Sequence, residues 1–272
     1  MDTLPEELIF EVKDNIGILT LNRSDKRNAL TTSMYEGMRH VFETVKKSDR
    51  IKVLIITGNG AGFCAGSDAE NRLLAHVVDD RYTKPLEETR ADLLEPVMLY
   101  FAPALYWIGK PSIAAVNGVA AGAGLSLALL CDIRIASEKA RFAASWLNVG
   151  LTPDVGATFT LPRIIGMEKA LKFFVTADNI DAKEAERINM VSQVVPHDDL
   201  MKKSIDLAAK IATGPSVAIE LTKRAVAQSL TSDLETQLHF ENYAQNICFM
   251  SADFREGVKA FQQKRRAEFK GI

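Results

Sequence analysis

Residues 110–132 read KPSIAAVNGVAAGAGLSLALLCD and contain the strongest structural signals in the chain. The run from Ser112 to Val116 is apolar and follows a proline, which is typical of a buried strand, and Asn117-Gly118 is typical of a turn. From Gly122 onward, glycine is followed by unbroken Leu and Ala, which predicts the start of a buried helix. The stretch therefore predicts a strand, a glycine turn and a helix, in that order.

The junction between this strand and helix has the features of an oxyanion or anion site. Small residues let a ligand approach the backbone closely, and the first N–H groups of a helix lack intrahelical partners. A second predicted strand, Val53 to Thr57, also ends in a glycine-rich turn, at 58–62, before Phe63-Cys64. Two such turns could each direct a backbone N–H at the same ligand oxygen. The alternative is that the glycines only allow tight packing of an apolar helix.

Length, charge and cysteine content restrict the class of protein. The chain has 272 residues, enough for one large domain or a domain with an appendage, and a formal net charge of −2, which gives no electrostatic basis for binding nucleic acid or an anionic membrane. Three scattered cysteines without C-x-x-C spacing argue against a disulfide framework or a zinc site, and no metal is expected. The acidic N-terminus, without a signal-peptide pattern, predicts a cytoplasmic protein or, alternatively, a matrix protein that has lost a transit peptide.

The first fifty residues predict a hairpin, a basic loop and a helix. Strands are expected at Leu8 to Val12 and Ile16 to Leu21, followed by the polar loop at 22–28, which carries three cations. That loop could hold a phosphate, or it could be a solvated turn. Thr31 or Thr32 is expected to cap a helix that runs to about Lys47 with one apolar face.

The segment from Ala69 to Gly109 is charged and weakly periodic. We expect its last part, Leu93 to Ile108, to form a core helix, and the part before it is long enough to form a lid over a pocket. His76 lies in this segment, where a surface position is the alternative to a catalytic one.

The second half of the chain changes from mixed α/β composition to all-α composition near Pro196. Before that point the predicted elements are strands at 133–136, 140–144 and 191–195 and helices at 167–177 and 182–189. After it they are helices at 200–212, 216–230, 233–250 and 252–269. We therefore expect a core at 1–196 and a helical oligomerisation region at 197–272. The loop at 147–156 carries one carboxylate, Asp154, which could equally be a turn residue or a helix cap.

Ordered motifs along nearly the whole chain support a family resemblance. They are Asn22-Arg23 with Asn28-Ala29-Leu30; 63–68 (FCAGSD); 110–132; 161–166 (LPRIIG); and Arg255-Glu256-Gly257 with 261–265 (FQQKR). Together they are similar to the crotonase (enoyl-CoA hydratase/isomerase) superfamily. The resemblance implies an α/β fold, a spiral of ββα units with a C-terminal helical region that builds trimers or pairs of trimers, and a coenzyme A thioester as ligand.

The resemblance also implies roles for individual positions. The backbone N–H groups of Cys64 and Ala123 would form an oxyanion hole around the thioester oxygen, so that the side chains there matter little. The positions that line up with the coenzyme A site are Lys26, Arg27, Ala29, Ala65, Ser67 and Asp68. Phe261 and Lys264 match positions that reach the nucleotide bound to a neighbouring subunit. Gly122, Ser126 and Trp146 are expected in the acyl pocket, and no cofactor is implied beyond the coenzyme A of the substrate.

The catalytic acids separate this sequence from the hydratases. The two glutamate positions that hydratases use correspond to Ser126 and Trp146, and neither side chain can serve as the acid or base that adds water to a double bond. The remaining acid, Asp154 in the motif GLTPD, resembles the single carboxylate of Δ3,Δ2-enoyl-CoA isomerases. One carboxylate suffices to move a proton from C2 to C4 of a dienolate.

The resemblance thus favours a Δ3,Δ2-enoyl-CoA isomerase and leaves three alternatives. The first is an enoyl-CoA hydratase. The second is an aryl-CoA dehalogenase or hydrolase, because Trp146 and Asp154 also resemble a pair in 4-chlorobenzoyl-CoA dehalogenase, although the water-activating histidine of that enzyme corresponds to Leu99. The third is a non-catalytic coenzyme A-binding or RNA-binding member, and the near-neutral charge argues against RNA. The acyl group stays open, because the segment at 69–109 resembles the family least.

Overall fold

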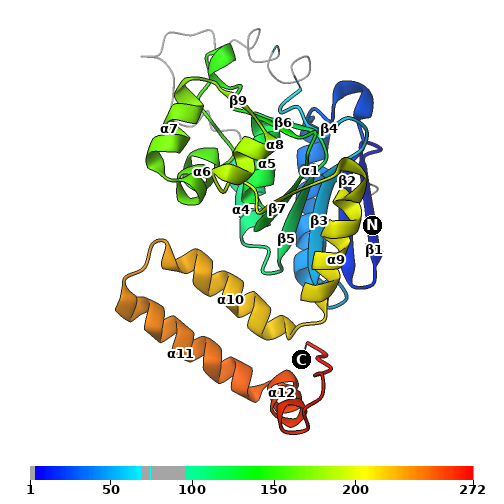
Figure 1. Ribbon diagram of the computed structural model, residues 1–272, viewed down its shortest axis with the longest axis vertical. Helices are drawn as coiled ribbons and strands as arrows, with labels where there is room; N and C mark the ends of the chain where they lie inside the picture. The colour runs from blue at the N-terminus through cyan, green and yellow to red at the C-terminus, as the bar shows by residue number, and fades with distance from the viewer. Residues whose placement is uncertain (1–3, 69–73, 75–95, 272) are drawn as a thin grey trace.

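The computed structural model describes residues 4–68, 74 and 96–271. Two β-sheets with helices packed around them form the core, and three C-terminal helices extend from one end of it (Figure 1). No helix among the described residues is long and apolar enough to cross a membrane.

The larger sheet has six strands in the order β1-β2-β3-β5-β7-β10. Their bounds are β1 Leu8–Lys13, β2 Ile16–Leu21, β3 Val53–Gly58, β5 Ser112–Val116, β7 Ile133–Ser137 and β10 Gln193–Val195. The β1–β2 pair is an antiparallel hairpin, and all the other neighbours are parallel. The central strands β3 and β5 have almost no polar residues because both faces of the sheet are covered.

The smaller sheet has four strands in the order β4-β6-β8-β9. Their bounds are β4 Gly62–Cys64, β6 Val119–Ala121, β8 Arg141–Ala143 and β9 Asn179–Asp181. Along the chain, β3 is followed by β4, β5 by β6, and β7 by β8, so each pair contributes one strand to each sheet. Helices follow these pairs, which builds a repeating ββα spiral.

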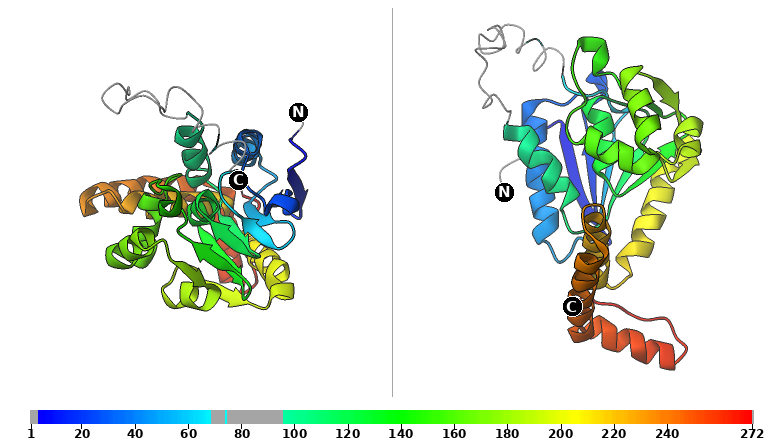
Figure 2. Two further views of the ribbon diagram at one scale, coloured as in Figure 1. Left: turned by 90° about the horizontal axis from the view of Figure 1, so that it is seen from above. Right: turned by 90° about the vertical axis from the view of Figure 1, so that its left-hand side faces the viewer.

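The helices cover the larger sheet on both faces. In the core they are α1 Thr32–Lys47, α4 Pro96–Tyr106, α5 Ala123–Leu130, α6 Ala157–Ile165, α7 Met167–Val175, α8 Ala182–Arg187 and α9 Leu200–Ala212. Strand residues alternate between two apolar clusters: Val53 and Ile55 pack with α9, whereas Leu54 and Ile56 pack with α1 and α5. Figure 2 shows α1 and α9 on opposite sides of the sheet.

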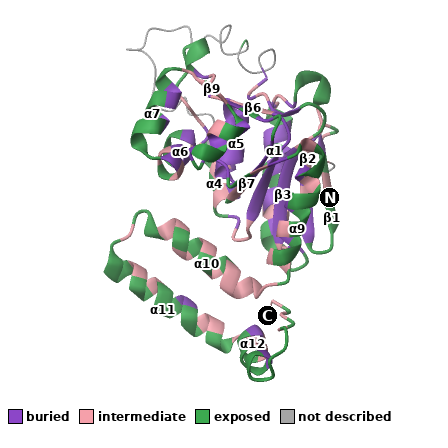
Figure 3. Cartoon of the chain, in the orientation of Figure 1, coloured by how far each residue is buried: buried purple, intermediate pink, exposed green. Residues whose placement is uncertain are grey.

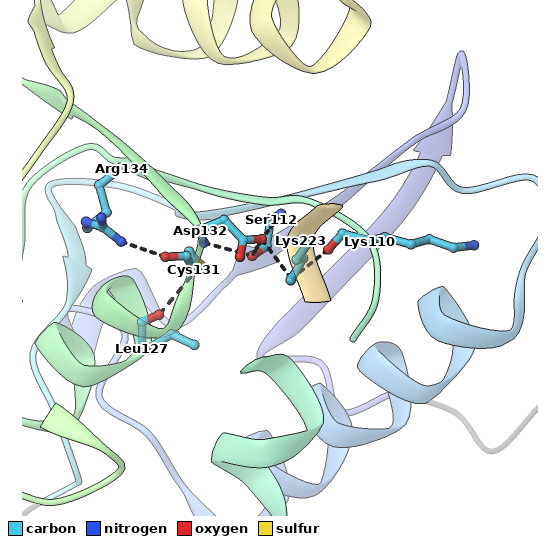
Figure 4. Close-up of polar contacts among 7 residues, drawn as sticks. All are labelled: Lys110, Ser112, Leu127, Cys131, Asp132, Arg134 and Lys223. Carbon is cyan, nitrogen blue, oxygen red and sulfur yellow. Dashed lines mark hydrogen bonds and ion pairs between the residues drawn. The ribbon is translucent and has the colours of Figure 1, made fainter. Parts of the chain in front are cut away.

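The C-terminal helices α10 Ser216–Ser229, α11 Leu234–Met250 and α12 Ala252–Gln262 form what we call the arm. Few arm residues are buried, in contrast to the strands of the core (Figure 3). One polar cluster fastens α10 to the core (Figure 4): the Lys223 Nζ donates to Asp132 Oδ2 at 2.7 Å and to the Lys110 carbonyl at 2.9 Å. The same Asp132 oxygen accepts from the backbone N–H and the hydroxyl of Ser112, at 2.7 and 2.8 Å.

Most elements expected from the sequence are present. The hairpin, the helix capped by Thr31, the central strand at 112–116 and the helix α9 are confirmed. The sequence reasoning missed α6 and the three-residue strands β4, β6 and β9, and the last helix ends at Gln262 rather than near Phe269. The helix α9, which lies in the expected oligomerisation region at 197–272, packs on the larger sheet, whereas the arm begins after Gly214. Of the expected helix at 93–108, the described part is α4.

The glycine-rich turn after β3, at 58–62, and the segment from Gly118 to Gly124 pack with backbone against backbone. A Cβ atom on Gly118 would lie 2.0 Å from the Ala61 carbonyl oxygen, and one on Gly124 would lie 2.2 Å from the Cys64 carbonyl oxygen. Both distances are far below any van der Waals contact. Glycine at position 118 lets the turns after β3 and β5 touch, and glycine at position 124 lets the start of α5 lie against the end of β4.

We predict that Gly124→Ala lowers the free energy of unfolding by about 1–3 kcal/mol, because the new methyl group must displace the Cys64 backbone. The matched control is Gly257→Ala, also in a helix, where the added Cβ would be 3.5 Å from the Phe269 ring. That control should gain about 0.5–1 kcal/mol from helix propensity. Urea denaturation followed by circular dichroism measures both, and equal stabilities of the two variants would contradict the packing argument.

Candidate active site

The backbones of Cys64 and Ala123 are brought together by the contact between the two glycine turns. Cys64 ends β4, which pairs with β6, and Ala123 is the first residue of α5. The N–H of a first helical residue has no partner inside its helix. Gly66, with φ +102°, packs closely on this junction, because an added Cβ would lie 2.9 Å from the Ala121 carbonyl oxygen. The backbones of Cys64 and Ala123 therefore lie close together at this junction.

A tryptophan and an aspartate lie beside this junction. The Trp146 Nε1–H donates to Asp154 Oδ1 at 2.8 Å. Trp146 is buried, with its ring edge-to-face against Phe174 at 5.9 Å between centroids. A Cβ on Gly122 would lie 3.9 Å from the Trp146 indole nitrogen, so the pair borders the turn that precedes α5. The indole thus holds one carboxylate oxygen of Asp154 in a fixed direction.

The chain after Asp154 is strained. Val155 has φ +50°, in the left-handed region where a β-branched residue costs roughly 1–3 kcal/mol, and Gly156 has φ +82°. The Asp154 carbonyl accepts hydrogen bonds from the Ala157 N–H at 3.0 Å and from the Ser126 hydroxyl at 2.9 Å. Such strain persists only where surrounding contacts fix the backbone, and it is concentrated at functional sites.

The basic loop at 22–28 is held by a buried asparagine. Asn28 is fully buried, and its side chain accepts from the Arg23 N–H at 2.8 Å and donates to the Asn59 and Gly62 carbonyls at 3.0 and 2.8 Å. The neighbouring Arg27 adopts φ +50° and is exposed. The loop is thereby tied to the glycine turn after β3, with Lys26 and Arg27 at the surface.

The segment 65–68 runs beside the basic loop. The Ala65 N–H donates to the Arg27 carbonyl at 2.9 Å, and Ser67 forms an isolated bridge with Leu30. Asp68 is buried and forms an ion pair with Arg23. The Asp68 carboxylate is therefore part of the internal support of the loop.

The structure brings most of the predicted site residues into two adjoining groups. Around the glycine turns lie Cys64, Gly122, Ala123, Ser126, Trp146 and Asp154. Around the basic loop lie Lys26, Arg27, Ala29, Ala65, Ser67 and Asp68. Phe261, in α12, and Lys264, just after it, lie away from both groups of the same chain, because α12 is at the opposite end of the molecule from β4 and β6 (Figure 1), and Phe261 is 86% exposed. His76 and the expected lid lie outside the described residues.

Sequence reasoning missed the supporting side chains. Asn28 was quoted only within a motif and Asn117 only as a turn residue, yet the Asn117 amide donates to the Gly60 and Gly62 carbonyls at 2.9 and 3.1 Å. The bond from Ser126 to the Asp154 carbonyl joins residues 28 positions apart. An asparagine between apolar runs was the available signal for Asn117. No local pattern reveals the buried role of Asn28 or the bond from Ser126.

Comparison with known proteins agrees with this geometry. A sequence model described as enoyl-CoA hydratase/isomerase matches residues 11–272. The chain belongs to this family. It is 37% identical to the 1,2-epoxyphenylacetyl-CoA isomerase of Escherichia coli over 98% of this chain and 99% of that protein, and 35% identical to the short-chain-enoyl-CoA hydratase of Clostridium acetobutylicum over 96% of each.

A solved relative confirms the fold. The crystal structure of an enoyl-CoA hydratase from Bacillus anthracis superimposes with a TM-score of 0.88 at 30% identity, covering 98% of this chain and 100% of that one. The α/β crotonase fold expected from the sequence is thus confirmed, including its C-terminal helical region. The chain is an enzyme of the enoyl-CoA hydratase/isomerase family, whose members carry both hydratase and isomerase names.

The Cys64 thiol is unreactive near neutral pH. Burial raises the pKa of Cys64 to about 12, only partly opposed by a backbone hydrogen bond from Gly66, and burial raises the pKa of Cys131 to about 12 as well. A thiol with such a pKa stays protonated and is not a nucleophile near neutral pH. The chemistry available at Cys64 is therefore that of its backbone.

We predict that Cys64 and Cys131 resist thiol reagents in the folded protein. Because both pKa values lie about four units above pH 8, roughly one thiol in 10⁴ is ionised there. In Cys248→Ser, which removes the only partly exposed cysteine, a chromogenic disulfide reagent should find no fast-reacting group until guanidinium chloride unfolds the chain and exposes two. Rapid labelling of Cys64 in the native variant, located by mass spectrometry, would contradict this.

Proposed function

We propose that this enzyme is an acyl-CoA isomerase that moves a double bond between Δ3 and Δ2 of an enoyl-CoA through a dienolate. The observation that carries the proposal is the position of Asp154: one carboxylate, held by the Trp146 indole at 2.8 Å, borders the junction of the two glycine turns. The thioester is the substrate class that the family implies.

The proposed chemistry divides between backbone and carboxylate. The N–H groups of Cys64 and Ala123 stabilise the negative charge that develops on the thioester oxygen when a C2 proton leaves. Asp154 accepts that proton and returns it to C4, which shifts the double bond into conjugation. Because the same group takes and returns the proton, the reaction needs no second acid and no water.

The leading alternative is an enoyl-CoA hydratase, which is the name of several relatives. Hydration requires an acid and a base around one water, and the two corresponding positions hold Ser126 and Trp146. The Ser126 side chain is fully buried, and its hydroxyl is engaged with the Asp154 carbonyl. These contacts favour isomerisation over hydration.

Two further alternatives are an aryl-CoA dehalogenase or hydrolase and a non-catalytic coenzyme A-binding protein. The hydrogen bond between Trp146 and Asp154 is compatible with the first, but the position expected to activate water is Leu99, an apolar residue that is 53% exposed on α4. Incubation with 3-hexenoyl-CoA, 2-hexenoyl-CoA and 4-chlorobenzoyl-CoA separates all four readings. Isomerisation of the first, hydration of the second, chloride release from the third, or no turnover of any identifies one of them.

Coenzyme A binding is proposed at the basic loop. Lys26 and Arg27 are exposed cations beside the segment 65–68, and Ala29, Ala65, Ser67 and Asp68 complete this part of the proposed site. Since Phe261 and Lys264 are far from the loop of their own chain, we propose that they reach the nucleotide bound to a neighbouring subunit.

Assembly into a trimer or a dimer of trimers is proposed through the arm. Large apolar side chains are exposed along it, namely Val226, Leu230, Leu234, Leu238, Phe249, Met250, Phe254 and Val258. So much exposed apolar surface on one structural unit is typical of a subunit interface. We propose a cytoplasmic protein with a small-molecule thioester substrate and without a nucleic-acid or membrane partner.

We predict that Asp154→Asn lowers the turnover of 3-hexenoyl-CoA by about 10²–10⁴-fold, the usual loss when a general base is removed, with binding retained. The asparagine can keep the hydrogen bond from Trp146, so the fold should be preserved. The comparison variant is His76→Ala, measured under identical conditions by the absorbance of the conjugated product. Near-normal turnover of Asp154→Asn with loss in His76→Ala would transfer the role of base to the histidine.

We predict that the double variant Lys26→Glu/Arg27→Glu binds coenzyme A more weakly, and that the wild-type affinity falls with salt, because the proposed attraction is to exposed phosphates. The matched control is Lys202→Glu/Lys203→Glu, which makes the same charge change on the exposed side of α9. Calorimetry should show a loss only in the first variant. If both variants bind equally, the loop is a solvated turn.

A further inference from the structure

The Ser126 hydroxyl connects two parts of the site that are distant in the sequence. Ser126 lies one helical turn after Ala123, in a helix whose residues are all buried, and its own exposed fraction is 0%. Its backbone N–H makes the helical bond to the Gly122 carbonyl at 3.0 Å. Its Oγ–H is directed out of the helix and donates to the Asp154 carbonyl at 2.9 Å.

The competing acceptor for this hydroxyl is weaker. A buried serine in a helix commonly donates back to the carbonyl of the residue four positions earlier, here Gly122, but that distance is 3.4 Å. The shorter bond therefore goes to the loop and not to the helix. Ser204, the other fully buried helical serine in the described residues, makes the ordinary bond to the Leu200 carbonyl at 2.9 Å.

The hydrogen bond from Ser126 is accepted by the residue directly before the strained part of the loop. The Asp154 carbonyl leads into Val155 and Gly156, which both have positive φ. A valine keeps a left-handed conformation only where surrounding contacts fix it. The Ser126 hydroxyl reaches the Asp154 carbonyl from α5, 28 positions away in the sequence, whereas the Ala157 N–H that also donates to this carbonyl lies three residues further along the chain.

We propose that Ser126 is a positioning residue that sets the distance between the Asp154 carboxylate and the backbone donor at Ala123; this inference rests on the proposed function. Ser126 fixes the main chain of Asp154 relative to α5, and Trp146 fixes the direction of its side chain. In this proposal Ser126, which the resemblance places in the acyl pocket, acts through the Asp154 main chain and not by contact with the substrate.

The test compares Ser126→Ala with Ser204→Ala in the full chain. Each variant deletes one fully buried helical hydroxyl, and only the first touches the site. With 3-hexenoyl-CoA, Ser126→Ala should lower kcat by about 10–100-fold, since a displacement of about 1 Å at a reacting group can cost that much. The dissociation constant of butanoyl-CoA, which cannot isomerise, should change less than about two-fold. Ser204→Ala should keep the wild-type kcat.

A double-variant cycle shows whether Ser126 acts through Asp154. In the Asp154→Asn background, Ser126→Ala should reduce the residual rate less than about two-fold, because no carboxylate is left to position. If the 10–100-fold loss persists there, or if Ser126→Ala alone keeps the wild-type kcat, the proposal is overturned. Should Ser126→Ala fail to fold, Ser126→Cys carries the same test, because it keeps the volume with a weak donor and should lose kcat in the same direction.

These measurements distinguish an error in the proposed function from an error in the proposed role of Ser126. Near-normal turnover by Asp154→Asn overturns the proposed function and the role of Ser126 together. An inactive Asp154→Asn combined with a fully active Ser126→Ala overturns only the role of Ser126. Thermal denaturation of every variant checks that a change in kcat does not follow from unfolding.

Discussion

The rest of the structure depends on a backbone-to-backbone contact that forms only because Gly118 and Gly124 have no side chain. Gly118 lets the turn after β5 approach the turn after β3, and Gly124 lets the start of α5 approach the end of β4, to distances at which no Cβ fits. Once the turns touch, their carbonyls leave water and must be satisfied from within, and Asn28 and Asn117 supply the donors. The Gly62 carbonyl, which accepts from both amides, joins the basic loop, the turn and the central strand in one rigid unit.

The proposed base belongs to a different kind of structure. Asp154 lies on a loop that contains a valine in a left-handed conformation, and the loop is held from outside by a buried hydroxyl and a buried indole. The glycine turns are fixed because no larger residue fits at Gly118 or Gly124, whereas the loop is held by a few directional hydrogen bonds. The two parts of the candidate site therefore depend on different residues and can change independently of each other.

The sequence predicted those parts of the fold whose signal is local. The strand at 112–116, the cap at Thr31 and both glycine turns follow from short runs of residues, and the motifs predicted the family. The strands β4, β6 and β9 have three residues each, which is too short for an alternating hydrophobic pattern to be recognised. The helix α6 was missed because it contains Pro162, and proline is rare inside helices. The ion pair of Arg23 with Asp68 and the bond from Ser126 to the Asp154 carbonyl depend on tertiary proximity, which no local pattern encodes.

In the proposed mechanism the junction contributes only main-chain atoms, which has a consequence for engineering. A substitution at Cys64 or Ala123 changes a side chain but leaves the peptide N–H in place, so the proposed backbone donors would be kept by every residue that fits, proline excepted. Acidic groups, in contrast, can be added or removed one codon at a time on α5 or on the loop after β8. A designer who wants new thioester chemistry on this scaffold should leave the glycines untouched and search combinations at Ser126, Trp146 and Asp154.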